Sequence, residues 1–270
     1  MGRVIAVANQ KGGVGKTTTA VNLAASLAAA EKRVLLVDID PQGNASSGLG
    51  YVRGQRDKPT VYDLLIDERP LAEIVVKTEL PYLDLVPANA DLAGAEIELV
   101  PLPHRELRLR GPLRAAAERY DYILLDTPPS LGLLTLNALS AADAVLVPLQ
   151  CEYYALEGLS DLRNTIGLVA QSLNPGLDIE GIVLCMVDPR QNLTEQVTNE
   201  VRSHFHGKVY DTTIPRNVRL SEAPSFGKPI LLYDIASKGA KSYLELAREL
   251  LGRHAANRAG ASATSVNEPR

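Results

Sequence analysis

Short runs of apolar residues alternate along this chain with longer amphipathic segments. Several of these runs are continuous, as in Val34-Leu35-Leu36-Val37 and Ile123-Leu124-Leu125. Continuous apolar runs predict strands that are covered on both faces, which is typical of parallel sheets. Strands are predicted over the ranges Arg3–Ala8, Arg33–Val37, Tyr82–Val86, Tyr122–Asp126, Ala144–Pro148, Ile179–Val187 and Val209–Ile214. With helix-like segments between them, the pattern predicts an α/β fold, a doubly wound, mostly parallel sheet with helices on both faces.

The pattern predicts one domain over residues 1–253, because no internal repeat or linker interrupts it. Residues 254–270 are small and polar, and this composition predicts a disordered tail. Inside the helix-like stretch Arg105–Tyr120, the pair Gly111-Pro112 predicts a kink or break, since proline removes a helical hydrogen bond.

The composition narrows the class of protein only modestly. Apolar residues make up 46% of the 270 positions and charged residues 22%, which is ordinary for a soluble globular protein. No run of about 18 apolar residues is present, so no membrane span is expected. The two cysteines, Cys151 and Cys185, have no metal-site spacing, and this favours a reducing cytoplasm.

The distribution of charge is more informative than the net charge of −4. Residues 1–180 carry 16 basic and 23 acidic side chains, a balance of −7, whereas residues 181–253 carry 10 and 8, a balance of +2. The basic side chains are thus weighted toward the C-terminal third, which favours an anionic partner there.

The strongest chemical signal lies in a glycine-rich turn between the first predicted strand and a predicted helix at Thr18–Ala30. Backbone N–H groups in such a turn, together with the helix N-terminus, attract phosphate groups. Lys16 supplies a point charge for the outer phosphates, and the Thr17 hydroxyl can ligate Mg²⁺. The predicted nucleotide-binding residues are Lys11, Gly12, Gly13, Val14, Gly15, Lys16, Thr17 and Thr18.

This turn departs from the standard phosphate loop G-x-x-x-x-G-K-[ST]. Its first glycine position holds Gln10, and the next position holds a second lysine, Lys11. The departure puts two cations beside one phosphate chain.

Two further motifs place carboxylates at the ends of predicted strands. Asp38 and Asp40 alternate with strand period, so both are expected to point the same way, where they can orient water and hold Mg²⁺ through its hydration shell. Asp126 ends the apolar strand Tyr122–Asp126, which matches the Walker B pattern and predicts a place near Mg²⁺.

Together these three motifs resemble the deviant Walker A ATPases, the group that contains ParA, MinD and the nitrogenase iron protein. Longer stretches look like the Soj-type chromosomal ParA proteins, and the resemblance covers about residues 1–250. These stretches are Asp38–Asn44 (DIDPQGN), Ala93–Val100 (AGAEIELV), Pro128–Leu139 (PPSLGLLTLNAL), Gln150–Ser160 (QCEYYALEGLS) and Ile214–Gly227 (IPRNVRLSEAPSFG).

The resemblance implies a role for individual residues of the nucleotide site. Lys11, Lys16 and Asp40 are the implied catalytic residues: Lys11 reaches across a dimer to the partner's nucleotide, Lys16 holds the β- and γ-phosphates, and Asp40 positions the attacking water. Thr17 is the implied Mg²⁺ ligand, and Gly12 must stay small where two subunits meet across ATP.

The resemblance also implies residues outside the loop. Pro215 and Asn217 match the region that lines adenine, and Arg190 and Arg219 match positions that contact DNA. Arg216 is left open between these two sites. Lys228, Lys241 and Arg248 are candidates to extend the DNA surface.

The implied function is an ATPase that uses ATP and Mg²⁺ to form a sandwich homodimer, binds double-stranded DNA without sequence preference, and hydrolyses ATP on stimulation by a ParB-like centromere-binding protein. Such a protein is expected in the cytoplasm, associated with the nucleoid. Two alternatives remain, a MinD-like membrane-cycling ATPase and an iron–sulfur reductase. The amphipathic segment Ser242–His254 is expected to pack on the core, so stable membrane binding is not expected.

Overall fold

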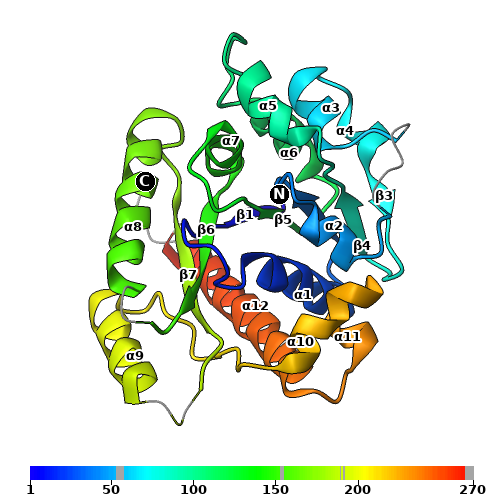
Figure 1. The fold of residues 1–270 in the computed structure, drawn as a ribbon. Coiled ribbons are helices and arrows are strands. Elements are labelled where there is room, and N and C mark those ends of the chain that lie inside the picture. The colour runs from blue at the N-terminus through cyan, green and yellow to red at the C-terminus, as the bar shows by residue number, and fades with distance from the viewer. Residues whose placement is uncertain (53–57, 153–154, 189, 191, 265–270) are drawn as a thin grey trace.

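The computed structural model describes residues 1–52, 58–152, 155–188, 190 and 192–264 (Figure 1). Within them, one seven-stranded sheet has the order β3-β4-β2-β5-β1-β6-β7. Every neighbouring pair is parallel except β3 with β4, so the predicted doubly wound, mostly parallel α/β fold is confirmed. The strands are β1 (Arg3–Val7), β2 (Val34–Asp38), β3 (Val76–Lys77), β4 (Leu83–Val86), β5 (Tyr122–Asp126), β6 (Ala144–Gln150) and β7 (Asp178–Cys185).

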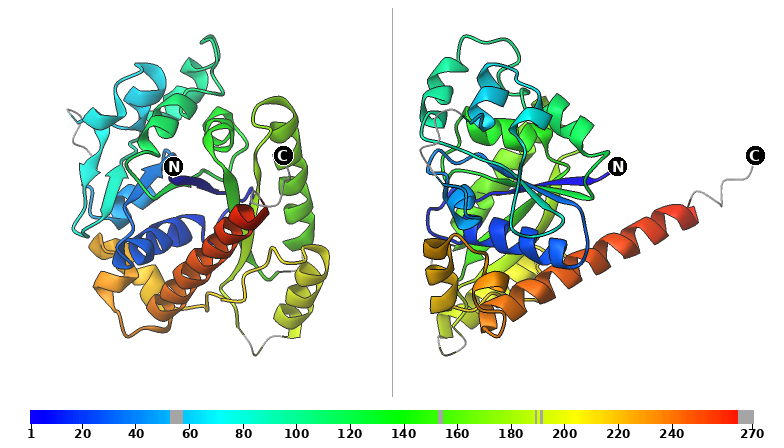
Figure 2. Two further views of the ribbon diagram at one scale, coloured as in Figure 1. Left: turned by 180° about the vertical axis from the view of Figure 1, so that it is seen from behind. Right: turned by 90° about the vertical axis from the view of Figure 1, so that its right-hand side faces the viewer.

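Helices cover both faces of the sheet (Figure 2). They are α1 (Lys16–Ala29), α2 (Asn44–Gly48), α3 (Val61–Ile66), α4 (Leu71–Ile74), α5 (Leu92–Glu98), α6 (Arg110–Ala116), α7 (Leu133–Ala141), α8 (Ala155–Ser172), α9 (Asn192–His204), α10 (Val218–Glu222), the 3₁₀ helix η1 (Ala223–Phe226), α11 (Ile230–Tyr233) and α12 (Lys238–Thr264).

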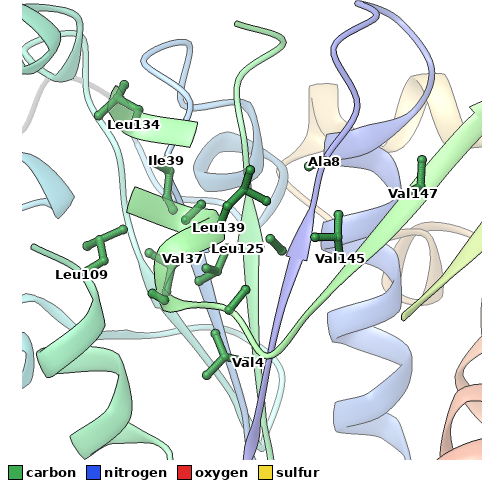
Figure 3. Packing of buried hydrophobic residues seen from close by; sticks show 14 of the residues in the cluster. Val4, Ala8, Val37, Ile39, Leu109, Leu125, Leu134, Leu139, Val145 and Val147 are labelled. Atoms are coloured by element: carbon green, nitrogen blue, oxygen red, sulfur yellow. The ribbon is translucent and has the colours of Figure 1, made fainter. Parts of the chain in front are cut away.

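Alternate side chains of the strands feed two separate hydrophobic cores. On β1, Val4 and Ala6 pack with the layer that contains α3 and α5 to α9, whereas Ile5 and Val7 pack with α1, α2 and α10 to α12. Figure 3 shows part of the first core, where Val37 of β2 and Leu125 of β5 are in register on neighbouring strands. Because both faces of the strands are buried, their sequences are continuously apolar.

The predicted strand Val209–Ile214 is wrong. Only single bridges form there, between Ile182 and Val209 and between Val187 and Pro215. Between them, the backbone N–H groups of Asp211 and Thr212 donate to the Glu249 carboxylate at 3.0 and 2.9 Å. A side chain from α12 therefore takes the hydrogen bonds that a continuous strand pairing would need.

Two helices differ from their predicted extent. α6 begins only at Arg110, so Pro112 lies in its first turn, where a missing N–H breaks no helical hydrogen bond. α12 continues to Thr264, past the boundary predicted at residue 254, and extends away from the sheet (Figure 2). Residues 255–264 are rich in alanine, which has the highest helix propensity.

The fold brings the three sequence motifs to one edge of the sheet. β5 lies between β1 and β2, and Asp126 is in register with both Val7 and Asp38. The loops that follow these three strands therefore leave from the same edge, the carboxyl edge, where ligands bind in open α/β sheets.

Candidate functional site

The glycine-rich turn has a backbone that its glycines make possible. Gly13 and Gly15 have positive φ angles of 75° and 92°. Such angles strain residues with a Cβ, so glycine is needed at both positions. Gly15 is the N-cap of α1, and no side chain from the described residues caps this helix end. The first N–H groups of α1 are therefore available to an anion.

The two lysines of the turn lie in different environments. Lys16 is buried, and its ammonium donates a hydrogen bond of 3.0 Å to the backbone oxygen of Lys11. Burial lowers the pKa of Lys16, while the charges of Asp126 and Asp40 act in the opposite direction. The Lys11 side chain is 43% exposed and forms an ion pair with Glu152. Lys16 thus faces the interior of its own site and Lys11 lies at the surface.

Asp38 is fixed beneath the site by a hydrogen-bond network. Its Oδ2 accepts the backbone N–H of Ser46 at 2.7 Å and the Ser46 hydroxyl at 2.6 Å. Its Oδ1 accepts the N–H of Asp40 at 3.2 Å. Burial nevertheless raises the pKa of Asp38 to about 6. Because both of its carboxylate oxygens accept hydrogen bonds, Asp38 holds the loop in place, and Asp40 remains as the candidate to position a water.

Asp126 is fully buried, and neither carboxylate oxygen has a hydrogen-bond partner in the described part of the chain. The Thr17 hydroxyl approaches it, but the geometry falls short of a hydrogen bond. Burial, followed by the charge of Asp38, raises its pKa well above the ordinary range. A buried carboxylate without a partner is a position that a bound cation would stabilise.

These groups fit a magnesium ion held largely by water and phosphate. Among the described residues, no group of three or more His, Cys, Asp or Glu side chains forms a metal site on its own. Mg²⁺ usually keeps several waters and takes one or two protein ligands plus phosphate oxygens. Thr17 and Asp126 supply a hydroxyl and a carboxylate of that kind.

A cavity of about 450 Å³ opens beside the start of α1. Pro215, Arg216 and Asn217 line it together with Gly15 and Thr18. The segment predicted to line adenine therefore lies next to the glycine-rich turn, although about 200 residues separate them in sequence. Asn217 is also the N-cap of α10, where its side chain accepts the N–H of Arg219 at 2.9 Å.

Both arginines predicted to contact DNA are exposed, and each is paired with acidic groups of its own chain. Arg190 donates to both carboxylate oxygens of Asp188. Arg219 pairs with Glu222 at 2.9 Å and with Asp234 at 3.5 Å.

Sequence reasoning missed several groups that support the site. Ser46 anchors Asp38, Glu152 pairs with Lys11, and the Asn9 side chain accepts the N–H of Lys11 at 3.0 Å. The segment DIDPQGNASS puts Ser46 close to Asp38, but an apolar pattern gives no sign of such pairing. The partner of Lys11 is 141 residues away, and no local signal identifies it.

Both cysteines are free thiols and both are buried. Cys185 is buried beneath Gly15, beside the Thr19 hydroxyl, and burial raises its pKa to about 12. Cys151 is buried in the core on the other face of the sheet. Burial raises its thiol pKa as well. Neither thiol resembles the reactive thiolate that an iron–sulfur cluster requires.

Comparison with protein families gives a consistent result. A family model described as an AAA domain matches residues 2–179. The chain is 63% identical to the chromosome partitioning protein ParA of Myxococcus xanthus, over 94% of this chain and 89% of that protein. It is 60% identical to the sporulation initiation inhibitor protein Soj of Bacillus subtilis, over 93% of this chain and 98% of that protein.

Solved structures share this fold, and one of the two described here holds a nucleotide. The structure of cobyrinic acid a,c-diamide synthase from Mycobacterium smegmatis with bound ADP and magnesium has a TM-score of 0.80 at 39% identity, covering 93% of this chain and 94% of that chain. The cell division ATPase MinD of Pyrococcus furiosus has a TM-score of 0.76 at 26% identity, covering 93% and 99%.

Membrane-spanning character is not found: none of the helices in the described ranges is both long and apolar enough to cross a bilayer. With the site geometry and the relatives in agreement, the chain belongs to the ParA/Soj family of chromosome-partitioning ATPases.

Proposed function

We propose that this protein is an ATP-dependent chromosome-partitioning switch. ATP brings two copies into a sandwich dimer, the dimer binds DNA without sequence preference, and hydrolysis, stimulated by a ParB-like centromere-binding partner, releases it. The nucleotide and its magnesium are supported by the bound ADP and magnesium of the relative from Mycobacterium smegmatis.

The observation that best supports this proposal is that the two lysines of the turn lie in different environments. Lys16 is buried and directed into its own loop, so it serves the phosphates bound there. Lys11 is at the surface, and its ion pair with Glu152 is half exposed and therefore weak. Lys11 can leave that pair at little cost and reach a nucleotide held by a second copy. Gly12, next to it, has open space around its Cβ position, as a contact surface requires.

The carboxylates support a hydrolytic role for the same site. Thr17 and Asp126 would hold Mg²⁺, which supplies charge stabilisation for the phosphate oxygens. Asp40 positions the attacking water, because its side chain is not committed to Ser46 as that of Asp38 is. In a single protomer no Lys11 from a second copy reaches the bound nucleotide, so hydrolysis depends on dimerisation.

Exposed arginines outside the nucleotide site support the DNA-bound state. Arg190 and Arg219 belong to the C-terminal third, where the charge balance is +2. A dimer would present each arginine twice, and bivalency would turn a weak surface into an effective one. Contacts to phosphate give affinity without sequence preference, so the protein would reside in the cytoplasm on the nucleoid.

The MinD-like alternative receives less support from the structure of α12. Its apolar residues Tyr243, Leu246, Ala247 and Leu250 are buried in the core with α1, as predicted, and are not available to a bilayer. Co-sedimentation with ATP separates the two functions. We expect the protein to sediment with DNA of unrelated sequence and not with anionic liposomes; sedimentation with liposomes alone would overturn the proposal.

A further inference from the structure

Asp188 forms an unusually complete interaction with Arg190. Its Oδ1 accepts the backbone N–H of Arg190 at 3.1 Å and its Nε at 2.9 Å, and its Oδ2 accepts an Nη of the same side chain at 2.8 Å. This is the planar, two-pronged geometry with which guanidinium groups also bind phosphate. A DNA phosphate and Asp188 would therefore compete for the same donors.

The two partners differ sharply in exposure. The Asp188 side chain is 16% exposed, whereas that of Arg190 is 87% exposed. Asp188 follows β7 and the bridge between Val187 and Pro215, which holds the backbone beside it. The acid is thus the fixed partner of the pair and the arginine is the partner that solvent and ligands can reach.

Asp188 also lies in the field of Arg216, a residue of the nucleotide cavity. The backbone N–H of Arg216 donates to the backbone oxygen of Val187 at 3.3 Å. Arg216 also lines the cavity beside Gly15. Arg190, followed by Arg216, lowers the pKa of Asp188 to about 2, so the carboxylate stays charged at every working pH.

We propose that Asp188 is an intramolecular competitor of DNA, which holds the Arg190 guanidinium and lowers the affinity of this surface for phosphate. The inference rests on the proposed function, because it assumes that Arg190 contacts DNA. The ion pair keeps the DNA affinity of each protomer low, so that DNA is held firmly only when two protomers bind it together.

The expected size of the effect follows from the exposure of the pair. An exposed ion pair contributes little to the free energy of the folded protomer. Removal of the two pairs of a dimer should therefore raise DNA affinity by roughly threefold to thirtyfold. The pair lies within one protomer, so its removal should tighten binding both with ATP and without nucleotide.

The test is the Asp188→Asn variant, which keeps the shape of the side chain and removes its charge. Binding to a short duplex of unrelated sequence is measured by fluorescence anisotropy over a range of salt concentrations. We expect tighter binding at low salt and a steeper salt dependence, by up to about 0.9 per protomer in the logarithmic slope, as an unpaired arginine becomes available to phosphate.

Two further variants separate a local effect from a change in net charge. Glu73→Gln on α4 makes the same change in net charge, at an exposed i,i+4 ion pair with Arg69. Figure 1 shows α4 at the opposite corner of the molecule from α9, the helix that follows Arg190 in the chain. This variant should leave the slope unchanged. In an Arg190→Ala background, Asp188→Asn should lose most of its effect, because the group that it releases is gone.

The possible outcomes separate failure of the Asp188 inference from failure of the proposed function. If Asp188→Asn binds DNA no better than the parent, while Arg190→Ala abolishes binding, this inference is wrong and the proposed function stands. Weaker binding by Asp188→Asn would show that the acid orients Arg190 toward DNA instead of competing. If the parent protein with ATP does not bind the duplex at all, the proposed function itself fails.

Discussion

At the scale of single residues, two buried carboxylates govern the electrostatics of the site. Asp38 and Asp126 are both buried and face each other across neighbouring strands, and Asp126 has no hydrogen-bond partner among the described residues. Burial raises the pKa of both carboxyl groups, and the charge of Asp38 adds to the rise at Asp126. Without a cation, ionised carboxylates in this position therefore destabilise the folded protein. The same arrangement is what a magnesium-dependent nucleotide site requires.

We therefore predict that Asp126→Asn stabilises the nucleotide-free protein while abolishing ATP hydrolysis. Removing a buried, unpaired charge should raise the free energy of unfolding by about 1–3 kcal/mol at neutral pH. Urea titration without nucleotide or magnesium measures this change. A variant that is less stable than the parent would show that the carboxylate has a favourable partner in the folded state.

The advantage of Asp126→Asn should depend on pH. In the folded parent, the pKa of Asp126 is raised above its unfolded value of about 4, so the folded state binds the proton more tightly. The parent therefore loses stability as pH rises from about 4 through the folded pKa, and regains it as pH falls. The difference between variant and parent should shrink on acidification from pH 7 toward pH 4. A constant difference would mean that Asp126 does not titrate in this range.

Gly12→Val and Asp40→Ala should fail in opposite ways. Position 12 has open space around its Cβ, so valine should leave the monomer folded but obstruct a second subunit, and the protein should stay monomeric with ATP. Asp40→Ala removes water positioning and keeps the phosphate contacts, so the ATP dimer should persist. Size-exclusion chromatography with ATP distinguishes them, and identical elution of the two variants would contradict the assigned roles.

The residues of the glycine-rich turn and their place between β1 and α1 could be predicted from sequence, because they are contiguous and follow an apolar run. The partners that restrain them could not. Glu152 beside Lys11 and Asp188 beside Arg190 are charged surface residues, and sequence gives no reason to prefer one acid over another as partner. Such contacts depend on side-chain geometry at the surface, which leaves no periodic pattern.

At the scale of elements, apolar periodicity predicted six of the sheet's strands and failed where polar groups decide the pairing. Val209–Ile214 has the β-branched composition of a strand, yet Glu249 of α12 captures the N–H groups of Asp211 and Thr212. β3, with two residues, is too short to produce a pattern. The six strands could be predicted because burial on both faces leaves an apolar run in the sequence. The error at Val209–Ile214 arose from a contact with a distant segment.

The packing of α12 provides a prediction at this scale. Leu246 is fully buried, so Leu246→Ala should lower the free energy of unfolding by about 2–5 kcal/mol. Glu245→Ala, at the exposed neighbouring position, should change it by less than about 0.5 kcal/mol. Urea titration of the two variants makes the comparison. If Leu246→Ala kept its stability but reduced binding to anionic vesicles, the apolar face would be a membrane surface.

For the whole molecule, we expect that ATP hydrolysis and DNA binding both depend on the assembly of two protomers. Each protomer holds a complete phosphate loop, but Lys11 and the exposed arginines are paired with acids of their own chain. Isolated protein should therefore hydrolyse ATP slowly, and DNA together with the cognate ParB-like protein should accelerate it. A phosphate-release assay tests this, and rapid turnover that is independent of protein concentration would contradict a site completed by dimerisation.

An ATP-driven switch is tested by the affinity of the protein for duplex DNA of unrelated sequence, measured with ATP, with ADP and without nucleotide. We expect firm binding only with ATP, a steep decrease in affinity with rising salt, and loss of ATP-dependent binding in Gly12→Val and Arg190→Glu. Arg190→Glu should still dimerise with ATP, whereas Gly12→Val should not. Equal DNA affinity in all three nucleotide conditions would contradict an ATP-driven switch and would require a different function for this site.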